Sequence, residues 1–306
     1  MRRYAWLLAG LLGGSAMNRT DAAESFIVVD AGSGYVFAAK AEDEPRPVAS
    51  LTKIATVVVA LEWLKESEGD AGELMSVSAD AVSSGVNPLT LAPGDAVSLE
   101  SAIFASMMAS DNTSAYVLAE HIGRRLEPDK PPSEAVAVFV DRMNRLAARL
   151  GMADTRFVNP HGLDEPGAQG VSTAADMARL AIHAYGLPDF ASYGSAKERE
   201  VSIVRGGSET PTRLINTNDL VGSRGIDGTK TGTTWRAGEC LVASGTAQFP
   251  EASQETTRRI ISVVLKAEER FRETVLLFNE AWTAYEDWLR RGEPIGPNES
   301  LLMPGN

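Results

Sequence analysis

The stretch "ASLTKIATVVVALEWL", Ala49–Leu64, decides the fold. Its long apolar run predicts a buried helix, and Pro45 and Pro47 break the chain just before it. Lys53 is a charge near the start of that run, where an ammonium is costly to desolvate. Ser50 precedes it by three residues, so both side chains share one helix face. A partly desolvated lysine can act as a base toward such a hydroxyl, although a serine cap beside a solvent-reaching lysine is the simpler interpretation.

The composition limits the possible functions. The chain has 306 residues, of which 44% are hydrophobic and 23% charged, so it can bury a substantial core in one large or two small domains. Its net charge of −12 argues against nucleic acid and anionic lipid as partners. Cys240 is the only cysteine, and the three histidines are far apart in sequence. We therefore expect no metal and no cofactor.

The N-terminal segment 1–23 is typical of an export signal. Arg2 and Arg3 precede a short apolar run, and small residues follow near Ala23, where we expect cleavage. An uncleaved anchor is the alternative. We therefore expect an exported, periplasmic or otherwise extracytoplasmic protein, with a catalytic domain over 24–290. The Gly/Pro-rich segment 291–306 is expected to be a flexible tail, with no C-terminal β-domain.

The order of the predicted elements is β–(long α)–β. Residues 25–30 and 35–40 predict a hairpin, and residues from about 70 to 200 look mainly helical, with helices over 98–108, 133–151 and 172–186 among them. Strands are expected at 238–247 and 259–267, separated by a polar segment, and a helix at 270–289. The acidic residues of that helix favour packing on the sheet, so any membrane association is peripheral at most. The ends of the chain would then share one sheet around a helical insertion.

Two further motifs raise the significance of Ser50 and Lys53. Ser110-Asp111-Asn112 lies at the break between two predicted helices, and Lys230-Thr231-Gly232 lies in "DGTKTGTT", before a strand-rich segment. SxxK, SDN and KTG occur together, in this order, in penicillin-binding proteins and class A β-lactamases.

With these motifs, the sequence resembles the serine D-alanyl-D-alanine carboxypeptidases, the low-molecular-mass penicillin-binding proteins of peptidase family S11. The similarity extends from Ser25 to Leu289 and includes "FVNPHGLDEPGAQGVSTAADMARLA" and "LINTNDLVGSRGIDGTKTGTTWRAGECLVAS". The resemblance implies an α/β fold of the α+β type, like that of DD-peptidases and β-lactamases. An antiparallel sheet would be flanked by N- and C-terminal helices and carry a large all-helical insertion.

The resemblance also implies roles for residues in acyl transfer. Ser50 would attack the carbonyl between two D-alanines and form an acyl-enzyme, and Lys53 would take its proton. Ser110, helped by Lys230, would protonate the leaving amine. The backbone N–H groups of Ser50 and Thr233 would form the oxyanion hole.

Further residues would bind the substrate, which is the stem peptide of peptidoglycan, and β-lactam antibiotics would be covalent inhibitors. Asn112 would hold the peptide backbone. The strand residues near the terminal carboxylate would be Thr231, Gly232 and Thr233. An arginine would help to fix that carboxylate; Arg272 is the first candidate and Arg270 the alternative.

Several alternatives remain open at the level of sequence. Thr217 stands where many relatives carry a basic residue, and the short C-terminus resembles that of members that are endopeptidases cutting peptidoglycan cross-links. Residues 165–169 approach the E-P-x-x-N stretch with which class A β-lactamases activate water, but Gln169 replaces the asparagine. A non-catalytic wall-binding module is the remaining alternative.

Overall fold

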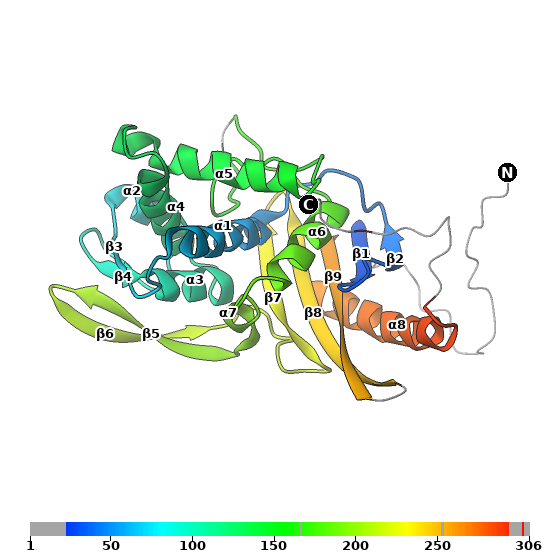
Figure 1. Cartoon of the computed structure of the whole chain (residues 1–306). Helices are drawn as coiled ribbons and strands as arrows, with labels where there is room; N and C mark the ends of the chain where they lie inside the picture. The colour runs from blue at the N-terminus through cyan, green and yellow to red at the C-terminus, as the bar shows by residue number, and fades with distance from the viewer. Residues whose placement is uncertain (1–22, 166, 252–253, 294–301, 303–306) are drawn as a thin grey trace.

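The main sheet joins the two ends of the chain. The computed structural model describes residues 23–165, 167–251, 254–293 and 302, so the predicted signal segment lies outside the described residues except for Ala23. The sheet has the order β2-β1-β9-β8-β7, with antiparallel neighbours (Figure 1). Its strands are β1 (Ser25–Asp30), β2 (Val36–Lys40), β7 (Ile226–Thr234), β8 (Gly238–Glu251) and β9 (Gln254–Ala267). The predicted pairing of sequence-distant ends is confirmed, and β7 forms one edge.

Helices cover both faces of this sheet. α6 (Ala174–Tyr185) packs on β9, β1 and β8 from one side, and α8 (Arg270–Arg290) packs on β9 and β8 from the other (Figure 1). The central strand β9 explains this layering, because its side chains alternate between two cores. Ile261 and Val263 belong to the larger core beneath α6, whereas Ile260 and Val264 pack with α8.

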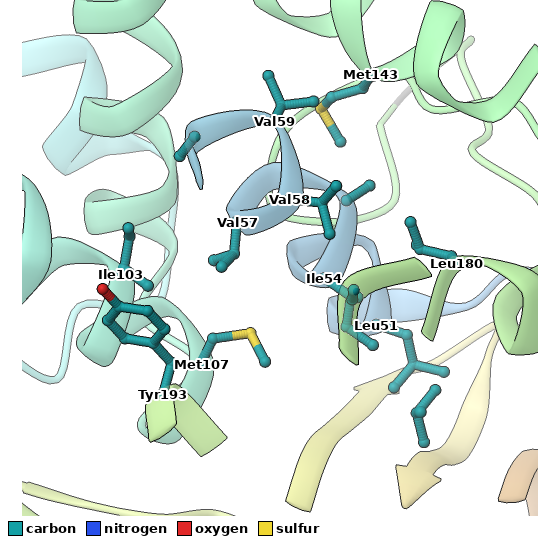
Figure 2. Close-up of a cluster of buried hydrophobic side chains, with 14 of the residues drawn as sticks. Leu51, Ile54, Val57, Val58, Val59, Ile103, Met107, Met143, Leu180 and Tyr193 are labelled. Atoms are coloured by element: carbon teal, nitrogen blue, oxygen red, sulfur yellow. The ribbon is translucent and has the colours of Figure 1, made fainter. Parts of the chain in front are cut away.

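The larger core is centred on α1 (Thr52–Ser67), which is preceded by a short 3-10 segment, η2 (Ala49–Leu51). Side chains of α1 such as Ile54, Val57 and Val58 are fully buried, and Figure 2 shows them among residues of the surrounding helices. Those helices are α3 (Leu99–Met108), α4 (Asn112–Leu126), α5 (Ala135–Arg149) and α6, with η3 (Pro132–Glu134) before α5. The short helix α2 (Ala79–Ser83) packs on α4, and α7 (Ser192–Ser195) packs on α3. The apolar run that follows Lys53 is therefore the scaffold that holds residues 49–53 in place.

The insertion between the two halves of the main sheet is not all-helical, and in that detail the prediction was wrong. A second sheet has the order β3-β4-β5-β6 and is built from β3 (Leu74–Ser76), β4 (Ala96–Ser98), β5 (Glu198–Arg205) and β6 (Ser208–Ile215). Gly206 and Gly207, both at positive φ, form the turn between β5 and β6. A Gly-Gly pair is a known hairpin signal that the sequence offered.

The boundaries of some other elements in the structure differ from those predicted from the sequence. β8 and β9 extend into the polar segment that was expected to separate them, and they remain paired as far as Glu251 and Gln254. Ser98 caps α3 by accepting a hydrogen bond from the Ser101 amide at 3.1 Å. In the C-terminal segment, Leu302 is buried and its amide donates to Gly34 O at 2.7 Å, while most of the predicted flexible tail lies outside the described residues. Within the described part of the chain, no helix has the length and apolarity needed to cross a membrane.

Candidate active site

Ser50 lies in η2, immediately before α1, and a tight local backbone holds it there. The preceding residue, Ala49, is buried and has φ +50°, a conformation that side-chain-bearing residues seldom adopt. Gly162 presses against this turn: a Cβ atom at that position would lie 1.9 Å from Ala49 O. Position 162 therefore has no room for a side chain, and the loop around it fixes the backbone beside Ser50.

Lys53 points toward Ser50 from the first turn of α1. Its Nζ donates to Ser50 Oγ at 3.0 Å, to Asn112 Oδ1 at 2.7 Å and to the backbone carbonyl of His161 at 2.9 Å. The side chain is fully buried. The sequence placed Ser50 and Lys53 on one helix face, and the structure adds that their polar atoms are in hydrogen-bond contact.

Burial also sets the protonation of this lysine. It lowers the pKa of Lys53 to about 7, although the nearby carboxylate of Asp111 acts in the opposite direction. An amine with this pKa is neutral in a large fraction of molecules near neutral pH. Lys53 can therefore accept a proton from the Ser50 hydroxyl, as a solvent-exposed lysine could not.

Ser110-Asp111-Asn112 forms the junction between α3 and α4, as the sequence predicted. Ser110 has φ +59°, a strained conformation that costs of the order of 1–3 kcal/mol in a residue other than glycine. Asp111 stabilises the junction, since its carboxylate accepts from the amides of Ser114 and Leu89 at 2.7 and 3.0 Å. Asn112 begins α4 and connects Lys53 to Ser84 O, to which its Nδ2 donates at 3.3 Å.

The edge strand β7 brings the third motif against η2. A Cβ atom on Gly232 would lie 2.9 Å from Val48 O and 3.1 Å from Ser50 N, so glycine is needed for this approach. The closest neighbours of this glycine are therefore backbone atoms at the start of η2. The backbones of Ser50 and β7 therefore lie side by side.

Lys230 and the threonines of β7 add polar groups along this strand. Lys230 is fully buried and its Nζ donates to Thr231 O at 2.9 Å. Its pKa is lowered by burial first, and further by the neighbouring charges of Lys53 and Arg270. Thr231 Oγ1 lies 2.5 Å from Thr217 Oγ1. Thr217, which stands where the resemblance implies a basic residue in many relatives, therefore contacts the Lys-Thr-Gly motif through its hydroxyl.

The arginine that reaches β7 is Arg270, the alternative candidate. Its Nη1 donates to Thr233 Oγ1 at 2.7 Å and to Gly232 O at 2.8 Å. Arg272 instead donates to Glu269 at 2.8 Å, one turn away on the exposed side of α8. On a helix, positions two apart point in different directions, so only one of these arginines can face the strand.

His161 is the residue that sequence reasoning missed. Its carbonyl accepts from Lys53, and its ring is buried. Burial first, and then the charge of Lys53, lower the pKa of His161 to about 3, so the ring stays neutral. Asn159 shapes this turn by accepting from the Gly162 amide at 2.6 Å. The Asn-Pro-His-Gly sequence was the available signal for a turn of this kind.

Glu165 begins the stretch that resembles the water-activating E-P-x-x-N motif of class A β-lactamases, but its carboxylate is bound by a neighbouring side chain, Asn159. Glu165 lies on an exposed loop, and its Oε1 accepts from Asn159 Nδ2 at 2.7 Å. The carboxylate is thus bound to the turn that supports Gly162.

The assembled cluster can perform nucleophilic acyl transfer. It contains a hydroxyl in contact with a buried amine of lowered pKa, and the Ser50 amide lies beside an edge strand. Arg270 supplies positive charge at that strand and Lys230 supplies an amine donor, and together they make a place where a substrate carboxylate could bind.

Comparison with known proteins agrees with this chemistry. A model of the peptidase S11 family, D-alanyl-D-alanine carboxypeptidase, matches residues 14–269. The D-alanyl-D-alanine carboxypeptidase DacC of Escherichia coli is 33% identical over 99% of this chain and 74% of its own length. A D-alanyl-D-alanine endopeptidase of Pseudomonas aeruginosa is 30% identical over 75% of this chain and 69% of its own length. Several other curated carboxypeptidases are longer, and the chain spans 56% to 63% of their length.

A solved structure extends the similarity to three dimensions. Penicillin-binding protein D2 of Listeria monocytogenes, solved in a cefotaxime-bound form, superimposes with a TM-score of 0.69 and is 28% identical. The match covers 85% of this chain and 97% of that protein.

Proposed function

Because this chain belongs to the D-alanyl-D-alanine carboxypeptidase family, we propose that it is a serine peptidase that removes the terminal D-alanine from peptidoglycan stem peptides. The observation that carries the assignment is the hydrogen bond between Lys53 Nζ and Ser50 Oγ, at 3.0 Å, inside a buried site. A serine hydroxyl needs an adjacent base to become a good nucleophile, and this contact supplies one without a histidine.

The first half of the reaction forms an acyl-enzyme. Ser50 Oγ attacks the carbonyl carbon of the penultimate D-alanine, and its proton passes to neutral Lys53. The carbonyl oxygen becomes an oxyanion, stabilised by the amides of Ser50 and Thr233, a contribution of about 3–4 kcal/mol per donor. When the intermediate collapses, the C–N bond breaks and the leaving amine receives a proton through Ser110, assisted by Lys230. Water then attacks the ester and gives a proton to Lys53, which returns it to Ser50 Oγ as the C–O bond of the ester breaks and the shortened peptide leaves.

The strand residues bind the leaving D-alanine. Its carboxylate is accommodated near Lys230, Thr231 and Thr233, and Arg270 supports this position through its 2.7 Å bond to Thr233 Oγ1. Arg270 therefore replaces Arg272 in the proposal. Asn112 contributes its side-chain amide to the substrate backbone and positions Lys53. β-Lactams would be attacked by the same serine and would remain as covalent inhibitors.

The export prediction belongs to the same proposal. We infer that residues 1–23 direct export, that residues 24–290 are the catalytic domain and that the enzyme works outside the cytoplasm, where peptidoglycan is found. N-terminal sequencing of protein recovered from a bacterial host tests this, since cleavage near Ala23 is expected and an intact Met1 would contradict it.

Digestion of purified muropeptides tests the reaction. Pentapeptide monomers should lose the terminal D-alanine and become tetrapeptides, with Ser50→Ala as the inactive control. Unchanged pentapeptides, under conditions where a known carboxypeptidase acts, would overturn the assignment.

The second candidate activity is cleavage of peptidoglycan cross-links, which the similarity to an endopeptidase favours. The same digestion separates the two activities, because cross-linked dimers would fall to monomers. Nitrocefin separates both from a β-lactamase: slow stoichiometric trapping is expected, whereas fast, repeated hydrolysis would contradict the peptidase assignment. Failure to bind fluorescent penicillin at all would favour a wall-binding module.

A further inference from the structure

Trp235 is the most exposed large apolar side chain in the described part of the chain. Its exposed fraction is 99%, whereas Trp63 and Trp288 are 7% and 1% exposed. The residue follows Thr234 in the short turn, 235–237, that connects β7 to β8. An indole ring in water gains none of the free energy that burial of its apolar surface would provide. Aromatic residues are also enriched at binding sites. Its position directly after the catalytic strand therefore calls for a functional explanation.

The proposed reaction gives the substrate a direction along β7. In that reaction the carbonyl is held where Gly232 approaches the Ser50 amide, and the leaving D-alanine is bound by groups from Lys230 to Thr233. The acyl side of the peptide must then continue past Thr233, toward the end of the strand. An extended residue spans about 3.3 Å, so the residue before the two D-alanines falls beside Thr234 and Trp235.

A second contact lies at this end of β7. Arg236 Nη1 donates to Gln169 Oε1 at 3.3 Å, which links the β7–β8 turn to the loop that follows His161 and Gly162. The turn and that loop are therefore neighbours beyond Thr233, on the side toward which the acyl part of the peptide extends. They offer an apolar ring next to polar and charged groups. This combination suits a long amphipathic side chain, with a hydrocarbon stem that packs on the indole and a polar end that reaches the loop.

We propose that Trp235 determines specificity for the residue that precedes the two D-alanines, by packing its indole against the hydrocarbon stem of a lysine-like or diaminopimelate-like side chain. The inference rests on the proposed function, because that reaction fixes the direction of the peptide. It makes Trp235 a substrate-binding residue outside the three motifs.

The test compares two peptides that differ only at this residue: Nα,Nε-diacetyl-Lys-D-Ala-D-Ala and N-acetyl-Gly-D-Ala-D-Ala. We expect Trp235→Ala to lower kcat/KM for the lysine peptide about threefold to tenfold and to leave the glycine peptide nearly unchanged. Trp235→Phe, which keeps an aromatic face, should restore most of the preference. Leu74→Ala is the matched control, because Leu74 is 54% exposed on β3 of the second sheet (Figure 1).

The outcomes separate this inference from the proposed function. If the wild type hydrolyses both peptides and Trp235→Ala preserves the ratio of their kcat/KM values, the inference is overturned and the function stands. If Trp235→Ala lowers kcat/KM equally for both peptides, the ring has no role in selecting the side chain, and the inference is again overturned. If the wild type releases no D-alanine from either peptide and forms no penicillin adduct, the proposed function fails and the inference with it.

Discussion

Lys53 Nζ lies 3.0 Å from Ser50 Oγ and has two further hydrogen-bond partners, Asn112 Oδ1 and the carbonyl of His161. These two partners can only accept from Nζ in this arrangement. A neutral amine has two hydrogens and one lone pair. When Lys53 is neutral, its two hydrogens satisfy Asn112 and His161, and the lone pair remains for the Ser50 hydroxyl. The surroundings of Lys53 therefore orient it as a base as well as lowering its pKa.

The pKa of Lys53 predicts the pH dependence of acylation. Because burial lowers this pKa to about 7, the neutral fraction rises with pH and levels off above that value. The second-order rate constant for acylation by benzylpenicillin should therefore increase between pH 5 and 8, with an inflection near pH 7. Stopped-flow measurements across this range check the prediction.

Lys53→Gln is the control for this profile. The rate should fall by a factor of the order of 10²–10⁴, as for loss of a general base, and the inflection should disappear. A variant that kept the same inflection would show that another group titrates.

Because Arg270 and Arg272 have different contacts, their substitution should have different effects on KM. Arg270→Leu removes the donor to Thr233 and a charge near the proposed carboxylate site. Charge-assisted hydrogen bonds contribute about 1.5–3 kcal/mol, so KM for a D-Ala-D-Ala peptide should rise roughly tenfold to a hundredfold. Arg272→Leu should change KM less than twofold, because Arg272 donates to Glu269 on an exposed surface. Steady-state kinetics check this prediction. A larger effect at Arg272 would show that Arg272, and not Arg270, helps to bind the substrate carboxylate.

The contact of Gly162 with η2 predicts a loss of both stability and activity. In Gly162→Ala, the added Cβ would meet Ala49 O at 1.9 Å, and φ is +82°. We expect destabilisation of at least about 2–3 kcal/mol and slower acylation, because Ala49 must move and Ser50 with it. Gly151→Ala is the matched control: φ is +72°, but no atom lies within 4 Å of the added Cβ. Urea unfolding should show only about 1–2 kcal/mol there, with normal acylation. Equal effects at both positions would contradict the packing argument.

His161 predicts part of the acid sensitivity. Its pKa is about 3 in the folded protein and near 6.5 when unfolded, so the unfolded chain binds more protons between these values. Stability is therefore lost as pH falls through this window, at up to about 1.4 kcal/mol per pH unit. In His161→Asn, the loss of unfolding free energy between pH 7 and 4.5 should be smaller by about 2–3 kcal/mol. An unchanged pH dependence would show that His161 does not remain neutral in the fold.

Most of the candidate site could be predicted from the sequence, because its motifs depend on local geometry. A spacing of three residues places Ser50 and Lys53 on one helix face, and Asp111 caps the helix that presents Asn112. The choice between Arg270 and Arg272 could not be made in this way, since it depends on how α8 is rotated against β7. The carbonyl of His161 was also missed, because a backbone group leaves no mark in the sequence of residue types.

The fold was predictable where apolar patterns are strong. Residues 52–60 of α1 and 260–265 of β9 are continuously buried and form strong apolar runs, whereas β5 and β6 are largely exposed and contain charged residues. Such strands show little hydrophobic alternation, so the sequence predicted no strand over residues 198–215.

The central claim is that Ser50 is the nucleophile, and intact-protein mass spectrometry after exposure to benzylpenicillin tests it most directly. The wild type should gain the mass of one penicillin molecule, located by peptide mapping on the segment that contains Ser50. Ser50→Ala should remain folded, by circular dichroism and thermal unfolding, and should gain no mass. An adduct of undiminished yield on folded Ser50→Ala, or one mapped to another residue in the wild type, would contradict the account.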